Sequence, residues 1–376
     1  DEEPVTHDVA LPRRERSTGV GHTEFDVEFD PGLPLAADLG RRDFTINAIA
    51  QDCATGTLVD PFDGRADLRE RVLRMVFPGS FTEDPLRILR GAQFAARFGC
   101  TIEPATWEAM REAVPLVDSV SRERVAEELT KLLTLAAEPS VGIRILQTLG
   151  VLECLLPELA QTLGVDQPGG YHAYDVFEHS LRTADAAPPR LKLRWAALLH
   201  DVNKPQCREI GEDKATFYGH DRQGARTAKR ILTRLRYPND LADQVALLVD
   251  KHMFTTGVSD KGVRRLIRKL GPELVYDLLD LRRADVVAQG KGGHTGDVDE
   301  LEARITAEIN SKAPFNRTDL AVDGGDLMTA LGLAPGPDLG RLIDALLEAV
   351  LDDPALNTRR RLLALARKLL ADKPSN

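Results

Sequence analysis

The hydrophobic pattern changes once along the chain, at about residue 80, and this change constrains the fold more than any other feature. Before it, Val5–Leu11 and Phe25–Phe29 alternate apolar and polar residues, the period of a half-buried β-strand. After it, apolar residues recur at helical spacing in one segment after another. The pattern predicts an α+β protein: a remnant of a β-sheet followed by an almost entirely helical body.

The first helical segment begins near residue 80, with an apolar stripe from Leu86 to Phe98 and Pro85 in its first turn, where a missing N–H is harmless. Pro- and Gly-rich breaks separate the later segments. Helices are predicted over residues 105–113, 121–137, 140–150, 173–187, 190–201, 220–236, 240–252, 260–268, 272–289, 298–310, 339–350 and 358–371.

Composition excludes several classes of protein. With 376 residues, 43% of them hydrophobic and 29% charged, the chain resembles an ordinary globular protein of several domains. No apolar run approaches the ~18 residues of a membrane helix, and no signal peptide is recognisable. The four cysteines form no CxxC pair, so we expect reduced thiols and a cytoplasmic protein. A net charge of −10 restricts RNA contact to local basic patches.

Two polar clusters adjoin strongly apolar segments. In "GRRDFTINAIAQD", Arg41, Arg42 and Asp43 directly precede an apolar run. In "FTEDPLRILRGAQFAARFG", Glu83–Arg87 heads an amphipathic helix. Charged side chains held on buried segments are typical of the walls of a small-molecule site.

Four motifs, in order, resemble one known family. The segments "RRDFTINA", "DPFDG" with its following "DL" and "R.LR", "F.EDPLRILR…FAARFG" and "PGPDLG" look like the class II tRNA nucleotidyltransferase (CCA-adding) and bacterial poly(A) polymerase family. The resemblance implies a nucleotidyltransferase head, a neck, a body and a tail, with an HD-type segment fused into the body in many bacterial members. We expect the head at residues 1–78, a neck with base-recognition and RNA-binding helices at 79–160, an HD-type body at 161–296, and a tRNA-binding tail at 297–376.

The resemblance also implies an activity: addition of CMP and AMP from CTP and ATP to the 3′ end of tRNA, whose acceptor stem is the partner. CCA addition, A-only addition and CC-only addition all fit, and no oligomeric state is indicated. The family's glycine-rich turn and D-x-D carboxylates, which hold Mg²⁺, have no counterpart in this sequence. We therefore expect a fragment lacking the first part of the head, with Asp8 as its one candidate catalytic carboxylate.

The base-reading residues follow from chemistry. Cytosine and adenine each present an amine beside a ring-nitrogen acceptor, whereas guanine and uracil present a carbonyl beside an N–H. One carboxylate next to one guanidinium reads both wanted bases. Asp84 and Arg87, at positions i and i+3 of one predicted helix, supply that pair, and Glu83 can orient Arg87. The alternative is an ordinary helix start with acidic residues near its dipole.

The first cluster, by resemblance, grips the rest of the nucleotide. Arg41 and Arg42 match phosphate oxygens, and Asp43 accepts from a ribose hydroxyl. Asn47 and Arg90 are assigned to the same nucleotide site. The alternative is a surface ion pair at the start of a strand or helix.

Histidines form a second candidate site. "YDVFEHSL", "LLHDVNKP", "FYGHDRQGA" and "LVDKHM" resemble the HD phosphohydrolase pattern. Its metal ligands carry over to His179, His200 and Asp201, with Asp285 closing the site and His220 and His252 completing a second position. Such ligands suit a divalent transition metal. Asn203 replaces the usual glycine, and a vestigial domain with satisfied histidines is the alternative.

The HD pattern defines the main alternative function, a metal-dependent phosphohydrolase acting on RNA 2′,3′-cyclic or 2′-phosphates. An RNA-binding protein without activity is a third hypothesis. RNA contact is predicted at a ridge of arginines spaced by four residues, Arg222, Arg226, Arg230 and Arg234, which suits backbone phosphates. A solvated helix face explains the same spacing.

Overall fold

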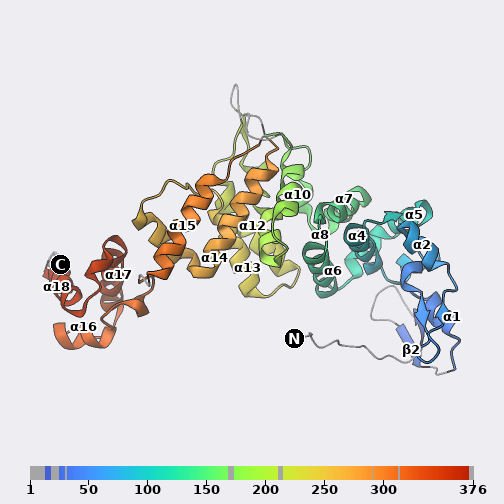
Figure 1. Cartoon of the computed structure of the whole chain (residues 1–376), viewed down its shortest axis with the longest axis horizontal. Helices are drawn as coiled ribbons and strands as arrows, with labels where there is room; N and C mark the ends of the chain where they lie inside the picture. Colours follow the sequence, from blue (N-terminus) through green and yellow to red (C-terminus); the bar gives the residue numbers. More distant parts are fainter. Residues whose placement is uncertain are drawn as a thin grey trace. The chain divides into compact units, whose positions relative to one another are not determined.

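A computed structural model describes residues 13–17, 25–29, 32–167, 173–210, 215–290, 292–311 and 314–371. Helices dominate this part of the chain, and the strands are short (Figure 1). The predicted α+β class, with a small sheet-containing head, is confirmed. The strand predicted at Phe25–Phe29 forms, whereas the one predicted at Val5–Leu11 lies outside the described residues.

Strands pair two by two among the described residues. Three of the four pairs are antiparallel. The remaining pair, β5 with β6, is parallel, with Val72 opposite Thr101. The strands are β1 (Arg13–Ser17) with β2 (Phe25–Phe29), β3 (Ala50–Gln51) with β4 (Leu58–Val59), β5 (Val72–Leu73) with β6 (Thr101–Ile102), and β7 (Glu209–Ile210) with β8 (Ala215–Thr216).

The α-helices are α1 (Leu35–Gly40), α2 (Gly64–Glu70), α3 (Ser80–Glu83), α4 (Leu86–Phe98), α5 (Pro104–Ala113), α6 (Arg122–Leu135), α7 (Pro139–Leu149), α8 (Val151–Leu155), α9 (Pro157–Ala160), α10 (Val176–Ala186), α11 (Leu191–Leu199), α12 (His220–Arg234), α13 (Asn239–Lys251), α14 (Asp260–Ala288), α15 (Gly296–Asn310), α16 (Gly324–Leu331), α17 (Pro337–Asp352) and α18 (Arg359–Ala371). Short 3₁₀ turns are η1 (Thr45–Asn47), η2 (Val114–Ser119), η3 (Pro205–Cys207), η4 (Arg317–Asp319) and η5 (Pro354–Leu356).

Every long helix was predicted to within a few residues, including the interruption of α14. Gly271 has φ 82° and ψ 163°, and Pro272 follows it. An α-helix cannot continue through that conformation, so the two predicted segments form one kinked element. The unpredicted helices α1, α2, α8, α9 and α16 have at most eight residues, too few for a helical period to emerge from the sequence.

The placement of Asp84 and Arg87 on one helix face is wrong. Helix α3 ends at Glu83, Asp84 is extended with φ −138° and ψ 96°, and Pro85 caps α4. The proline ring clashes with an α-helical conformation of the residue before it. Asp84 therefore lies in a break between two helices, and only Arg87 lies in α4.

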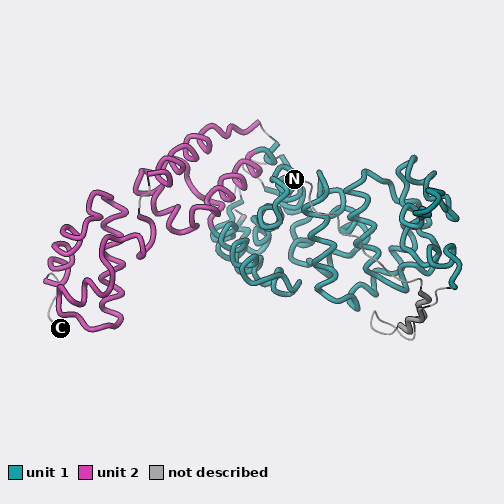
Figure 2. Tube along the Cα trace, turned by 60° about the horizontal axis from the view of Figure 1, so that its bottom comes forward, with its two compact units in different colours: residues 1–250, 287–291 teal, residues 251–286, 292–376 magenta. Residues whose placement is uncertain are grey.

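The described chain divides into two compact units, coloured separately in Figure 2: residues 1–250 with 287–291, and residues 251–286 with 292–376. In the first unit, α4 packs against α6 and α7, and α10 packs against α7 and α11. Trp195, Ile88 and Leu132 are among its fully buried side chains. The predicted division into head, neck, body and tail stays a prediction.

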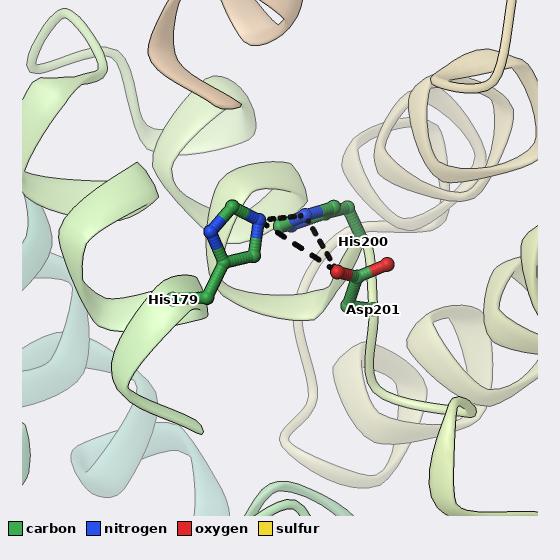
Figure 3. Close-up of side chains that lie close together, drawn as sticks. All are labelled: His179, His200 and Asp201. Carbon is green, nitrogen blue, oxygen red and sulfur yellow. Dashed lines mark hydrogen bonds and ion pairs between the residues drawn. The ribbon is translucent and has the colours of Figure 1, made fainter. Parts of the chain in front are cut away.

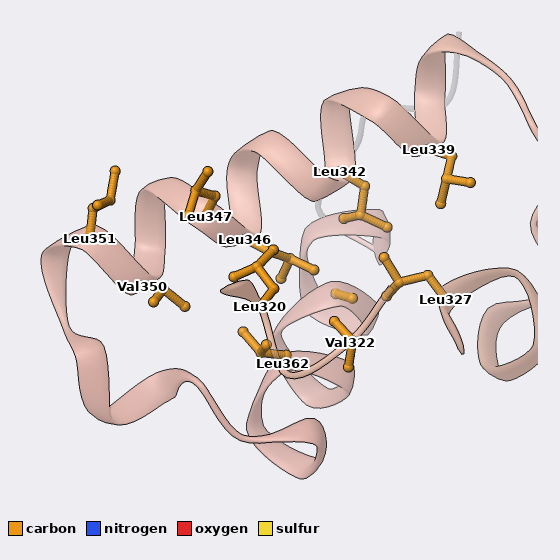
Figure 4. Close-up of a cluster of buried hydrophobic side chains, with 11 residues drawn as sticks. Leu320, Val322, Leu327, Leu339, Leu342, Leu346, Leu347, Val350, Leu351 and Leu362 are labelled. Carbon is orange, nitrogen blue, oxygen red and sulfur yellow. The ribbon is translucent and has the colours of Figure 1, made fainter. Parts of the chain in front are cut away.

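In the second unit, α16, α17 and α18 enclose an apolar core (Figure 4). Leu327, Leu346 and Leu362 are buried at its centre. Arg264 of α14 donates to the main-chain oxygens of Leu351 and Asp352. These carbonyls lack partners within α17 because they end the helix, so the guanidinium caps it. Among the described residues, no helix is both long and apolar enough to cross a membrane.

Gly142 allows α7 to approach two helices at once. A Cβ atom there would lie 2.5 Å from Leu132 Cδ1 of α6 and 3.0 Å from the main-chain oxygen of Ala92 in α4. We expect Gly142→Ala to lower the free energy of unfolding by about 1–3 kcal/mol through overpacking.

The measurement is urea unfolding followed by tryptophan fluorescence, because the chain's 2 tryptophans, Trp107 and Trp195, both belong to the first unit. Thr148→Ala, at an exposed position of the same helix, is the matched control and should leave stability nearly unchanged. Equal stability of the two variants would contradict the close packing at Gly142.

Candidate nucleotide pocket and buried histidine cluster

A polar pocket of about 480 Å³ lies in the first unit. The segment after α1, the start of α4 and the first turn of α6 form its walls. Five of its lining residues are arginines, and two are aspartates. The lining residues are Arg41, Arg42, Asp43, Asn47, Asp84, Leu86, Arg87, Arg90, Phe94 and Arg124.

Asp43 organises one wall of the pocket. Its residue is 6% exposed, and Oδ1 accepts from the Phe44 main-chain N–H at 2.8 Å and from Asn47 Nδ2 at 3.0 Å. Oδ2 accepts from Arg90 Nε at 2.7 Å. The neighbouring Phe44 is fully buried and pairs with Met75 in an isolated bridge. The apolar run therefore anchors the charged cluster, as its sequence predicts.

Arg90 connects this wall to two helices. Besides Asp43, its NH1 lies 3.5 Å from Glu128 Oε1 of α6, and its guanidinium carbon lies 5.2 Å from the centroid of the Phe94 ring. Burial alone would lower the pKa of Arg90, but the Asp43 and Glu128 carboxylates outweigh burial and raise it. The guanidinium is thus a permanent positive charge in a partly buried site.

Arg87 forms the second wall. Its NH1 donates to the main-chain oxygen and the Oγ of Ser80, at 3.2 and 2.9 Å, and its NH2 donates to the main-chain oxygen of Arg41 at 2.8 Å. The guanidinium carbon lies 5.7 Å from the centroid of the Phe77 ring. These contacts fix the plane of the guanidinium and join α4 to the segment that carries Asp43.

Asp84 is held from the opposite side by Arg124 of α6. The two oxygens of Asp84 accept from Arg124 NH1 and NH2 at 3.2 and 2.7 Å, and Oδ1 also accepts from the main-chain N–H of Leu86 at 3.2 Å. This is a bidentate pair, a geometry that only arginine provides.

The structure brings together seven of the nucleotide-site residues named from the sequence: Arg41, Arg42, Asp43, Asn47, Asp84, Arg87 and Arg90. Glu83 is exposed on α3 and is outside the pocket lining. Asp8 lies outside the described residues. Phe94 and Arg124 also line the pocket but were not among the predicted residues. Phe94 stands in the predicted apolar stripe, while "SRERV" around Arg124 is indistinguishable from the start of any solvated helix.

A second polar cluster is buried deep in the first unit (Figure 3). His179 comes from α10, and His200 and Asp201 follow the last turn of α11. The Nε2 atoms of His179 and His200 are 3.2 Å apart, and Asp201 Oδ2 lies 3.2 Å from His200 Nε2 and 3.7 Å from His179 Nε2. His220, the first residue of α12, places Nε2 3.3 Å from Asp201 Oδ1.

The donor set fits a divalent metal. Two ligands about 2.1 Å from one ion lie about 3.0–3.4 Å apart in octahedral or tetrahedral arrangement, close to the spacing of these atoms. The Nδ1 of His200 lies 2.8 Å from the main-chain oxygen of Ala197, and the Nδ1 of His220 lies 2.7 Å from the main-chain oxygen of Phe217. A carbonyl can only accept, so each Nδ1 carries the proton and leaves Nε2 able to coordinate.

Lys204, which sequence analysis passed over although it follows in "HDVNKP", adds a positive charge. Its Nζ lies 2.6 Å from Asp201 Oδ2 and donates to Gln167 Oε1. Burial raises the pKa of Asp201, but His200 and Lys204 outweigh it, and the pKa is held well below its ordinary value. Asp201 is therefore an ionised carboxylate, the form that binds a cation.

The remaining predicted metal ligands, His252 and Asp285, are buried, and the arginines of the predicted RNA ridge are exposed. His252 and Asp285 are buried in the second unit, and Arg282 NH1 lies 3.4 Å from Asp285 Oδ2. The predicted arginine ridge, Arg222, Arg226, Arg230 and Arg234, is exposed along α12. Arg234 forms a bidentate pair with Glu158. That pair restricts one end of the ridge to an intramolecular role.

Comparison with known proteins agrees with this arrangement. A family model described as the poly(A) polymerase head domain matches residues 4–74. One described as "Probable RNA and SrmB- binding site of polymerase A" matches residues 99–163. A tRNA nucleotidyltransferase domain 2 model matches residues 220–366.

Individual relatives are tRNA nucleotidyltransferases or CCA proteins. The chain is 38% identical over 344 residues to an A-adding tRNA nucleotidyltransferase of Deinococcus radiodurans, covering 87% of this chain and 78% of that protein. It is 43% identical over 254 residues to a multifunctional CCA protein of an Azoarcus species, covering 65% of this chain and 60% of that protein. The CCA-adding enzyme of Bacillus stearothermophilus, solved in complex with CTP, has a similar fold, with a TM-score of 0.65, 25% identity, and 92% and 76% of the two chains covered.

The fold and these matches define a nucleotidyltransferase with a head of the poly(A) polymerase type. The chain belongs to the class II tRNA nucleotidyltransferase family, which includes the CCA-adding and A-adding enzymes. The family and enzyme class expected from the sequence motifs are thereby confirmed. The alternative of an RNA phosphohydrolase has no support from these comparisons.

The buried position of Asp43 makes a prediction about stability. We expect Asp43→Asn to lower the free energy of unfolding by about 1–3 kcal/mol, because Arg90 loses a charged partner in a site with little water. Asp118→Asn is the matched control, since Asp118 pairs with Arg122 at 2.8 Å but has a side chain 67% exposed. Exposed pairs contribute little, so this control should unfold like the wild type.

Both variants are measured by urea unfolding with tryptophan fluorescence. Equal effects of the two substitutions would show that the Asp43–Arg90 pair does not support the pocket.

Proposed function

We propose that this protein transfers CMP and AMP from CTP and ATP to the 3′ end of tRNA, and that the pocket between residues 41–47, α4 and α6 selects the base. The observation that carries the proposal is the joint presence in one pocket of a held carboxylate, Asp84, and a held guanidinium, Arg87. Enzymes of this class depend on a divalent metal, and we propose Mg²⁺.

Asp84 and Arg87 suit the wanted bases by hydrogen-bond polarity. The carboxylate accepts from the amine of cytosine or adenine, and the guanidinium donates to the adjacent ring nitrogen. Uracil and guanine offer a carbonyl to the carboxylate and an N–H to the guanidinium, so both contacts become repulsive. Because both side chains come from rigid surroundings, the pocket needs no nucleic-acid template to distinguish these pairs.

The opposite wall suits the sugar and phosphates. Asp43 Oδ1 already accepts two hydrogen bonds, whereas Oδ2 accepts one, from Arg90. A carboxylate oxygen has two lone pairs, so Oδ2 can accept from a ribose hydroxyl. Arg41 and Arg42 supply guanidinium groups for the phosphates. Arg41 is oriented by Asp38, and Arg42 donates to the main-chain oxygen of Asn47.

The acceptor stem of tRNA is the proposed partner, and exposed Arg222, Arg226 and Arg230 on α12 are its proposed phosphate contacts. Such contacts recognise the shape of the RNA helix rather than its sequence. Their affinity therefore falls steeply as salt rises.

Selectivity tests the proposal. Arg87→Ala in the full-length protein should reduce discrimination of CTP over UTP, and of ATP over GTP, by about 1–3 kcal/mol, because the donor to the ring nitrogen is lost. The measurement is extension of tRNA lacking its 3′ nucleotides with each of the four NTPs. Arg97→Ala, exposed on the same helix, is the matched control.

Wild-type selectivity in Arg87→Ala, alongside a native fluorescence spectrum, would exclude Arg87 from base reading. Loss of selectivity in Arg97→Ala as well would trace the effect to α4 as a whole rather than to this side chain.

We also propose that His179, His200 and Asp201 hold a divalent transition metal, and that His220, on the other oxygen of Asp201, belongs to a second position of the same cluster. The favouring observation is the common spacing of its Nε2 and carboxylate atoms, together with the Nδ1–carbonyl contacts that orient two of the rings. Bound to His179, His200 and Asp201, the ion would link α10 to the end of α11.

Metal analysis tests this site. Purified protein equilibrated with Mn²⁺ or Ni²⁺ and then desalted should retain metal. His200→Ala should not, because it removes the Nε2 atom that lies 3.2 Å from both His179 Nε2 and Asp201 Oδ2. His294→Ala, at an exposed histidine, is the control and should retain metal like the wild type. Metal-free wild-type protein with native tryptophan fluorescence would contradict the proposal.

A further inference from the structure

Arg124 has an unusual position among the pocket residues. Of the residues that line the pocket in the described part of the chain, it alone comes from α6. Its NH1 and NH2 contact the two oxygens of Asp84 at 3.2 and 2.7 Å. The side chains are only 25% and 20% exposed, so water competes weakly for this pair.

The hydrogen bonds of Asp84 distinguish its two oxygens. Oδ1 accepts from Arg124 NH1 and from the main-chain N–H of Leu86, whereas Oδ2 accepts from Arg124 NH2. Because each oxygen has two lone pairs, Oδ1 is saturated and Oδ2 can accept one further hydrogen bond. The carboxylate thus offers one acceptor position rather than several.

We propose that Arg124 is a specificity-determining positioning residue: it saturates one oxygen of Asp84 and so directs the amine of the incoming cytosine or adenine to Oδ2. The inference rests on the proposed role of Asp84 as a reader of the base. Arg124 makes that role selective without contacting the base itself.

The backbone around Asp84 explains why a positioning residue is needed. Asp84 lies in the extended break between α3 and α4, so its residue belongs to neither helix. Arg87, the other half of the base-reading pair, is fixed independently by Ser80 and by the main-chain oxygen of Arg41. Selective recognition requires the acceptor and the donor to keep their separation to about 0.5 Å. Arg124 supplies that restraint for the acceptor.

Helix α6 is itself anchored near Arg124, which lies in its first turn. One turn later, Glu128 is buried, lies 3.5 Å from Arg90 NH1 and accepts from Lys131. Arg124 and Glu128, at i and i+4, share a helix face, and both contact residues of the pocket wall. The register of α6 against α4 therefore sets the position of the Arg124 guanidinium.

The test is a change of geometry without a change of charge. Arg124→Lys keeps the positive charge but loses the two-pronged contact. In the full-length protein, kcat/KM is measured for each of the four NTPs on tRNA lacking its 3′ nucleotides. We expect the CTP/UTP and ATP/GTP ratios to fall about tenfold or more, with kcat/KM for UTP and GTP unchanged or higher. Arg122→Lys, two residues earlier in the same helix and paired with exposed Asp118, should keep both ratios.

A purely structural arginine would lower kcat/KM for all four nucleotides alike, and that result overturns the inference. A double variant tests the route through Asp84: in an Asp84→Ala background, which has no side-chain acceptor, Arg124→Lys should change the ratios no further, and an additive loss overturns the inference too. Arg124→Gln, which keeps a hydrogen-bond donor, replaces Arg124→Lys where the lysine variant loses its native fluorescence. Absence of any base preference in the wild type would instead refute the proposed function.

Discussion

The pocket depends on the attachment of one irregular segment to one helix. Residues 41–47 follow a short helix and contain a 3₁₀ turn and one isolated bridge, from Phe44 to Met75, so regular secondary structure does little to hold their charged groups in place. Two arginines of α4 do so: Arg90 pairs with the Asp43 carboxylate, and Arg87 donates to the main-chain oxygen of Arg41. Hydrogen bonds of a charged donor in a partly buried site are among the stronger polar contacts in proteins.

The charges of α6 complete this arrangement from behind. The Arg124 guanidinium of α6 pairs with the Asp84 carboxylate, and the Glu128 carboxylate of α6 lies beside the Arg90 guanidinium. Each buried charge thereby has a partner, without which burial would be costly. The base-reading end and the sugar-binding end of the pocket are consequently supported by the same helix pair, α4 and α6. A shift of α6 would alter both ends together.

Most of the pocket could be predicted from the sequence because its residues stand beside segments with clear periodicity. Arg87 and Arg90 lie on an evident amphipathic helix, and Arg41–Asp43 precede an apolar run. Asp84 was misplaced because helical spacing was extended through Pro85, although a proline restricts the residue before it. Arg124 lies 40 residues from its partner Asp84, and nothing local distinguishes it from neighbouring solvated arginines. Tertiary packing alone gives it a role.

The same limit applies to the histidine cluster. The adjacent His200 and Asp201 at the end of an apolar segment indicate a polar site, because a buried carboxylate needs partners. Lys204 and the carbonyl contacts that set the histidine tautomers depend on how α10, α11 and α12 meet. Neither is encoded in the spacing of the residues.

The central claim is that the pocket reads an amine through Asp84. Its most direct test compares the binding of ATP with that of purine riboside triphosphate, which lacks only the 6-amino group, to the wild-type protein by isothermal titration calorimetry. The account predicts that the analogue binds about tenfold more weakly, and that this difference disappears in Asp84→Ala, which removes the acceptor. Equal affinity of the wild type for the two triphosphates would contradict it.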